Sequence, residues 1–236
     1  MILADSDYQT IYKGIKNELD KVAFAVKKEE NKAKKIFYNS STFPCCHSTT
    51  YTVPSSQNKY LIWYYCDNPR EAQYSTYYYG FSLLLTDSEG KQFAVLCRPY
   101  KNKDRKREES IQIFSGHFFS RYRERMKLGN RMSTYDLMTT FFGRNVPYMA
   151  KLNWEELTVK PEHYKDSPSA WRIDDGVTFG AEYQLTLDDG RSLHVTKHNT
   201  FLSESTLKNE QKPHVPSNFI MRESIMREFD LEDTYL

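Results

Sequence analysis

The chain has 236 residues, and 33 Lys and Arg stand against 31 Asp and Glu, so its formal charge is only +2. This balance argues against a general polyanion binder that works through a basic tail, and the length is sufficient to bury a core. The charge is unevenly distributed, because residues 98–132 contain 11 basic and 4 acidic residues, net +7, which leaves −5 for the rest. Such a segment is a candidate binding surface for an anionic partner.

Helical periodicity is strongest in residues 6–36. Ser6 and Gln9 can form a capping box, and apolar residues recur at helical spacing as far as Val26. Beyond Val26 the pattern is rich in Lys and Glu, so we expect the distal half to project from the fold or to pair loosely. Residues 1–37 are therefore predicted to be a long N-terminal helix that serves packing or contacts a protein partner, including a second copy of the chain.

Residues 38–58 are rich in Ser, Thr and Pro, which predicts a loop or linker. Residues 59–236 are predicted to form the following domain. Within it, residues 60–66 are apolar on both faces, as expected of a buried central strand. Residues 76–85 alternate, and a turn leads from them into residues 93–97, which completes a hairpin. The predicted fold class is α+β, with antiparallel β-hairpins packed with helices and a long N-terminal helix in addition.

The cysteines show neither paired metal-ligand spacing nor a dense disulfide pattern, and Cys45 and Cys46 are neighbours, which rarely ligate one metal together. The sequence also lacks a Walker loop, a dinucleotide fingerprint and an H-E-x-x-H pair, so we predict neither a metal nor a cofactor. Asp5 and Asp7 stand where a signal peptide would need an apolar core, and no apolar run is long enough to span a bilayer. We therefore expect a cytoplasmic protein with no membrane partner.

The most concentrated chemistry lies in residues 115–126, which are predicted to form a short helix with a divided surface. Its apolar side carries Phe118, Phe119, Tyr122 and Met126. The opposite side carries His117, Ser120, Arg121, Glu124 and Arg125. An imidazole one turn before a guanidinium can bind a phosphate or transfer a proton. The alternative is a solvated helix face with scattered charges.

A second hairpin is predicted to turn at residues 188–190, with a polar row on one of its faces. Burial favours a register that keeps the apolar residues opposite one another. That register pairs Leu187 with Leu193, Leu185 with Val195, Gln184 with Thr196, and Glu182 with His198. The polar row is either a solvated sheet face or a ligand or catalytic surface. A metal held by His194 and His198 is least favoured, because residues four apart on a strand lie about 13 Å apart.

The order of these parts resembles small ribonuclease toxins of the barnase, colicin and RelE-like class. The resemblance covers residues 109–211, in which His117, Arg121 and Arg125 recur every four residues on a helix. A hairpin that ends in Lys197, Thr200 and Phe201 follows. The long N-terminal helix and the first aromatic hairpin have no counterpart in a minimal toxin domain.

The resemblance implies metal-independent cleavage of RNA phosphodiesters by general acid/base catalysis. Such cleavage needs a base for the ribose 2′-hydroxyl, for which His117 or Glu182 would serve, and an acid for the leaving 5′-oxygen, for which His198 would serve. The groups expected to act in catalysis are His117, Arg121, Glu182, His198 and Thr200. The groups expected to bind the substrate are Arg125, Lys197 and Gln184. In the register above, Lys197 falls on the apolar face, so it reaches this site only if the strand bulges.

Two other functions are compatible with the sequence. A non-catalytic binding module would use the basic segment of residues 98–132 to contact nucleic acid or an acidic protein partner. A structural or assembly protein would pair its long N-terminal helix with that of a second copy.

Overall fold

The computed structural model describes residues 1–88, 90–101, 107–129, 131–146, 149–157, 168–218 and 220–221. In chain order these contain α1 (Tyr8–Tyr38), β1 (Cys45–Thr52), β2 (Lys59–Cys66), α2 (Pro69–Tyr74), β3 (Tyr78–Thr86), β4 (Gln92–Lys101), β5 (Arg107–Phe114), α3 (Gly116–Arg125), α4 (Thr134–Asn145), β6 (Ala150–Leu152), α5 (Trp154–Leu157), β7 (Pro168–Ile173), β8 (Gly176–Thr186) and β9 (Ser192–Ser203). Short 3-10 turns follow at Glu204–Thr206 and Lys212–His214.

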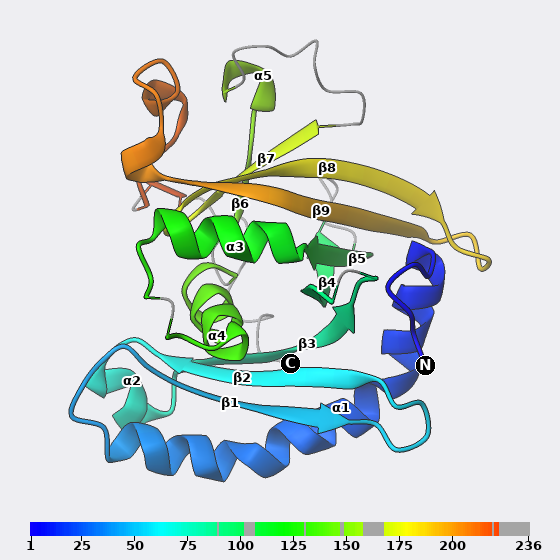
Figure 1. Ribbon diagram of the computed structural model, residues 1–236. Coiled ribbons are helices and arrows are strands. Elements are labelled where there is room, and N and C mark those ends of the chain that lie inside the picture. Colours follow the sequence, from blue (N-terminus) through cyan, green and yellow to red (C-terminus); the bar gives the residue numbers. More distant parts are fainter. Residues whose placement is uncertain are drawn as a thin grey trace.

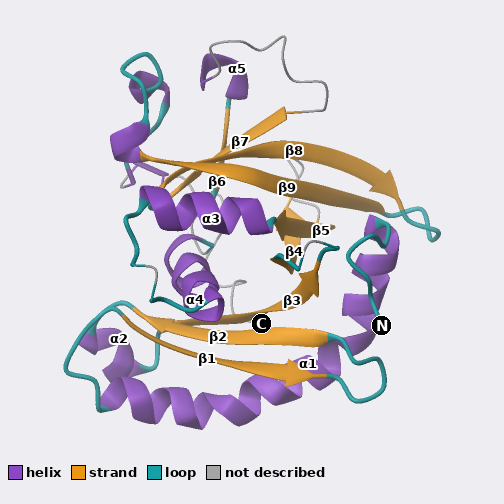
Figure 2. Ribbon diagram, viewed as in Figure 1, coloured by secondary structure: helices purple, strands orange, loops and turns teal. Residues whose placement is uncertain are grey.

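The described strands form one nine-stranded sheet in the order β1-β2-β3-β4-β5-β9-β8-β7-β6. Neighbouring strands pair antiparallel, except that β5 and β9 pair parallel. The sheet curls so strongly that α3 and α4 lie between its two halves, with α1 along the outside (Figure 1; Figure 2). The α+β class with a long N-terminal helix is confirmed, and the parallel β5–β9 pair joins the two antiparallel halves.

The two faces of the sheet carry separate cores. The outer face packs Tyr60, Ile62 and Tyr64 of β2 against α1. The inner face packs Leu61 and Trp63 of the same strand against the aromatic side chains of α3 and α4. Residues alternate between faces along a strand, so β2 is apolar throughout because both of its faces are covered.

Helix α1 is packed along its whole length, contrary to the expected projecting half. Its buried stripe continues through Val26 and Ala33 to Phe37. The Lys and Glu residues between these positions occupy the outer side, so the charge-rich composition hid an intact apolar stripe. The helix also begins differently from the prediction, since Asp7 rather than Ser6 is the N-cap and accepts a hydrogen bond from Thr10 N at 2.8 Å.

The predicted linker at residues 38–58 contains a strand, β1. Its side chains alternate between more and less exposed positions, and it pairs with β2 along its full length, from Cys45 opposite Cys66 to Thr52 opposite Lys59. Ser and Thr suggested a loop, but β-branched Thr is also favoured on a sheet surface, and polar side chains suit an edge strand.

The β8–β9 hairpin has a register that differs from the prediction by two residues. Leu185 lies opposite Leu193, and Glu182 lies opposite Thr196 rather than His198. A loop over residues 188–190 closes it, with Leu187 N donating to Arg191 O at 2.8 Å. Because the difference is an even number of residues, the predicted division into polar and apolar faces is kept.

Candidate functional site: the outer side of α3 and β9

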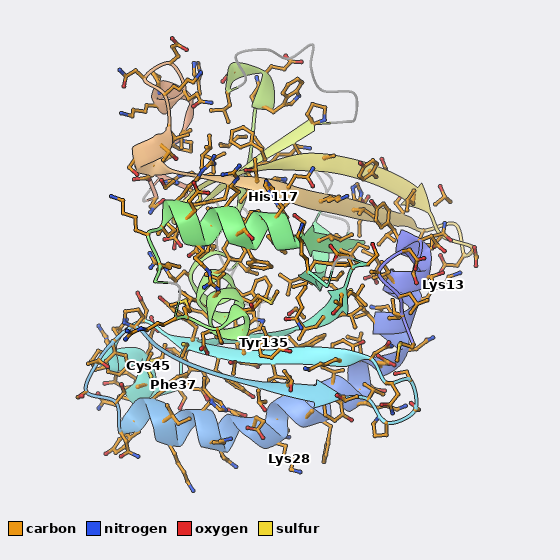
Figure 3. The ribbon with its side chains drawn as sticks, in the orientation of Figure 1. Lys13, Lys28, Phe37, Cys45, His117 and Tyr135 are labelled. Carbon is orange, nitrogen blue, oxygen red and sulfur yellow. The ribbon has the colours of Figure 1, made fainter. Side chains whose placement is uncertain are left out.

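Helix α3 has the divided surface that its sequence predicts. Ser115 is the N-cap, and its hydroxyl accepts a hydrogen bond from Phe118 N at 3.1 Å. Phe118, Phe119 and Tyr122 are buried among aromatic rings of β5, α4 and β9. His117 is exposed, and Figure 3 shows it on the side of α3 that borders β9.

Helix α3 lies beside the part of β9 that extends beyond the end of β5. Ser115 N donates to His198 O at 3.4 Å, and the Arg125 guanidinium donates to Phe201 O. The helix therefore covers the strand edge that β5 leaves open, which satisfies backbone carbonyls at that edge. This contact brings the α3 row next to residues 197–200 of β9.

His198 is not part of an exposed site. Its side chain is fully buried, and its ring stacks on Phe114 with centroids 4.4 Å apart and planes inclined by 11°. Nδ1 lies 2.9 Å from the Thr178 hydroxyl. Burial lowers the pKa of His198 to about 3, so the imidazole is neutral near pH 7. The expectation that His198 donates a proton to a leaving group is therefore wrong.

Glu182 and Gln184 share the inner face of the sheet with His198. Glu182 forms an ion pair with Lys151 of β6, and Gln184 Nε2 donates to the Ser192 hydroxyl at 3.3 Å. His117 turns away from the aromatic core, whereas these two side chains lie on the same face as that core. The structure therefore does not bring Glu182 and Gln184 together with His117.

Lys197 and Thr200 lie on the outer face of β9. The register between β8 and β9 shifts at Phe179/Gly180, since Phe179 pairs with Thr200 and Gly180 with His198. Asn199 is thus the extra residue of a β-bulge, which lets both His198 and Phe201 face the aromatic core. The strand does bulge as the ribonuclease hypothesis required, but the bulge follows Lys197 and leaves it on the outer face.

Each of the two packed elements therefore has a side that points away from the aromatic core. On α3 this side carries His117, Ser120, Arg121 and Glu124, with Arg125 at its border to β9. On β9 it carries Lys197 and Thr200. Both sets point away from the aromatic core that α3 and β9 share. We call this the α3–β9 surface.

The α3–β9 surface is cationic. It carries Arg121, Arg125 and Lys197 against one acidic side chain. The acidic one, Glu124, accepts from Arg121 Nη1 at 2.8 Å, and both side chains are exposed, so this ion pair leaves the guanidinium accessible. Burial, followed by the repulsion from Arg121, lowers the pKa of Arg125.

The basic segment of residues 98–132 is divided into two parts by β5. The acidic residues at the start of β5 are paired, since Glu108 contacts His194, and Glu109 lies 3.4 Å from both Lys16 and Arg191. From its first to its last residue β5 spans about 23 Å. Residues 102–106 and the side chains of 98–101 and 107 lie outside the described part.

A buried carboxylate near α3 that no sequence pattern predicts accepts several hydrogen bonds. Asp175, after β7, accepts from the Tyr122 hydroxyl at 2.6 Å and from Asn145 Nδ2 at 2.9 Å, and it forms an ion pair with Arg144. It joins α3, α4 and the β7–β8 turn. Because Asp175 is buried and fully occupied by these donors, its role is to hold α3 in place.

The described residues contain no group of three or more His, Cys, Asp or Glu side chains arranged to hold a metal ion. All four cysteines are unbridged. In the same part of the chain, helices are either too short or too polar to cross a bilayer.

Comparisons with known proteins found no match to a family model, to a curated protein or to a solved structure. The resemblance to ribonuclease toxins therefore stays a prediction.

Proposed function

We propose that the protein binds RNA by its phosphates on the α3–β9 surface. The observation that carries this proposal is that His117 and Arg121 on α3, and Lys197 and Thr200 on the neighbouring β9, all point away from the aromatic core that the two elements share. The side chains provide two fixed cations, a titratable imidazole and a hydroxyl on one side of two packed elements. Such donors complement phosphate oxygens.

The kind of cation supports a phosphate site on α3 in particular. Residues 116–129 contain three Arg and one Lys, whereas α1 contains eight Lys and no Arg. The planar guanidinium binds phosphate through two hydrogen bonds at once, and a Lys-rich helix face is the usual composition of a solvated surface. The α3–β9 surface is therefore a better candidate than the outer side of α1.

The test measures the affinity for a fluorescent single-stranded RNA by anisotropy at several salt concentrations. We expect Arg121→Glu to weaken binding at least tenfold at low salt, and Arg121→Ala to reduce the slope of log K against log salt by about 1. Lys28→Glu is the matched control, because Lys28 lies on the side of α1 away from the sheet (Figure 3). Equal losses for the Arg121 and Lys28 variants, or no binding by the wild type, would refute the proposal.

Metal-independent cleavage of the bound RNA is a second candidate, favoured by the exposed His117 one turn before Arg121. A neutral imidazole there can accept the 2′-hydroxyl proton, and Arg121 and Lys197 can stabilise the charged phosphorane. His198 takes no part in this version and Glu182 is not required, so solvent water protonates the leaving 5′-oxygen as its bond to phosphorus breaks and the bond from phosphorus to the ribose 2′-oxygen forms.

Cleavage is tested with RNA in EDTA, using His117→Gln and Arg121→Ala. We expect His117→Gln to lose cleavage while it keeps RNA affinity within about twofold, because glutamine keeps a polar side chain at this exposed position but cannot accept the 2′-hydroxyl proton as a general base. If the folded wild type binds RNA but leaves it intact, the protein is a binding module and the ribonuclease candidate fails.

A further inference from the structure

An open pocket of about 860 Å³ adjoins the α3–β9 surface. It lies on the outer face of the sheet, between the N-terminal segment with the start of α1 and the strands β4, β5, β8 and β9. Its apolar wall consists of Tyr8, Ile11, Phe93, Ile113 and Leu185. The size and the apolar lining are those of small-molecule sites.

Lys197 links this pocket to the α3–β9 surface, because its side chain also lines the pocket. In the register of the sheet it lies between Ile113 of β5 and Ala181 of β8, so its stem stands on an apolar floor. Among the described residues it makes no hydrogen bond or ion pair. Its ammonium group is therefore available to an anion at the boundary between pocket and surface.

Carboxylates line other walls of the pocket. Asp7 is committed to the backbone and hydroxyl of Thr10, each at 2.8 Å, and Asp87 accepts from Lys91 N at 2.8 Å. Asp5, in the N-terminal segment, has no hydrogen-bond partner within the described ranges. Three carboxylates against one ammonium disfavour a wholly anionic occupant. They suit a molecule with an anionic group at Lys197 and hydrogen-bond donors on its body.

We propose that the pocket binds a nucleobase that carries an exocyclic amino group, with its phosphate on Lys197 and its amino group donating to Asp5. Tyr8 and Phe93 supply aromatic surface against which a base can pack, with aliphatic contacts from the floor. This inference rests on the proposed function, since Lys197 belongs to both sites. It names the substrate class as RNA with an amino-bearing base at the position next to the bound phosphate.

The test titrates nucleoside monophosphates by calorimetry or NMR, in pairs that differ by one amino group. We expect CMP to bind at least fivefold more tightly than UMP, and GMP at least fivefold more tightly than IMP. Asp5→Asn should remove both preferences, while Asp20→Asn on the exposed side of α1 keeps them. Lys197→Met should reduce the affinity for CMP about tenfold and leave the affinity for cytidine, which has no phosphate, unchanged. Lys28→Met should change neither affinity.

Variants that fill the pocket provide an independent test of the inference. Leu185→Trp fills it from β8, and Ala4→Trp fills it from the N-terminal segment, which avoids dependence on one strand position. Each should reduce the affinity for CMP at least tenfold with an unchanged thermal melt. Failure of all nucleotides to bind, equal affinity for CMP and UMP, or wild-type binding by a folded pocket-filled variant would overturn the inference.

Each of the two proposals can be refuted without refuting the other. If Arg121→Glu abolishes RNA binding while the pocket-filled variants bind RNA and nucleotides like the wild type, the proposed RNA binding by the α3–β9 surface is supported and the pocket inference is refuted. If CMP binding depends on Lys197 and Asp5 while substitution of Arg121 leaves the RNA affinity unchanged, the pocket is supported as a nucleotide site and the proposed function is refuted.

Discussion

The imidazole of His198 illustrates how surroundings decide the chemistry of a residue. Its place in the predicted polar row suggested a catalytic acid, but Phe114, Phe118 and Trp171 surround its ring. His198 faces inward by the regular alternation that also places His194 and Thr196 on the inner face. A histidine in such a place acts as a flat apolar side chain with one hydrogen bond to Thr178.

His198 should make the protein less stable in mild acid. In the unfolded chain this group takes up a proton below a pKa of about 6.5, while in the folded protein it does so only near 3. Between these values the unfolded state binds more protons, so stability falls as pH falls, by up to about 1.4 kcal/mol per pH unit.

Urea unfolding from pH 7.5 to 4.5 checks this contribution. We expect the free energy of unfolding of His198→Phe to decline less steeply than that of the wild type. Parallel slopes for wild type and His198→Phe would contradict the prediction.

The Tyr122 hydroxyl should contribute measurably to stability, because it is one of the buried donors to Asp175. Burial and the nearby Asp175 raise the pKa of Tyr122 well above its usual value, so the phenol stays protonated and donates. We expect Tyr122→Phe to lower the free energy of unfolding by about 1–3 kcal/mol. Tyr38→Phe, at an exposed position, should change it little, and equal stabilities of the two variants would count against the network.

At the scale of elements, the contact between α4 and β2 depends on a glycine. A Cβ atom at Gly143 would lie 2.1 Å from the Cβ of Tyr65, too close for either element to stay in place. Alanine is the better helix former by about 1 kcal/mol.

We nevertheless expect Gly143→Ala to destabilise the protein by about 1–3 kcal/mol, because overpacking outweighs propensity. Chemical denaturation measures the difference. Gly129→Ala, where a Cβ meets nothing within 4 Å, is the control and should be near neutral. A Gly143→Ala variant as stable as the wild type would show that the helix shifts without cost.

Helix α1 is an integral layer rather than a detachable arm. Its buried residues cover the outer face of β2 and β3, and Glu18 accepts from the Tyr60 hydroxyl at 2.6 Å and from Asn58 at 3.0 Å. Removal of residues 1–36 would expose that face to water. We expect the truncated chain to be unfolded or aggregated by circular dichroism and gel filtration. A folded truncated protein of unchanged secondary structure would contradict this.

At the scale of the whole molecule, the sheet joins both halves of the chain. The β5–β9 pair connects β1–β4 to β6–β8, and α3 and α4 bridge the halves through one aromatic core. We expect a single unfolding transition, with coincident loss of far-UV and near-UV circular dichroism. Two separated transitions would mean that the two sides of the sheet unfold independently.

The sequence predicted much of the local structure. Helical spacing in α1 and α3, the two-sided apolar pattern of β2 and the alternation in β8 and β9 were sufficient, because period and burial are local properties. The prediction was wrong at β1, because Ser and Thr are compatible both with a loop and with an edge strand. It also failed for the distal half of α1, where Ala33 and Phe37 continue the stripe among charged residues.

The candidate site was predicted only in part for a different reason. The divided face of α3 follows from its own periodicity, so His117 and Arg121 could be identified from the sequence. Whether they lie beside Lys197 or Glu182 depended on the parallel pairing of β5 with β9, and the outward position of Thr200 depended on the bulge at Asn199. One extra strand residue reverses which side chains face outward. Local periodicity is enough to show which faces carry charge. Which of those faces meet depends on contacts between residues about 80 positions apart, and these contacts form only in the folded molecule.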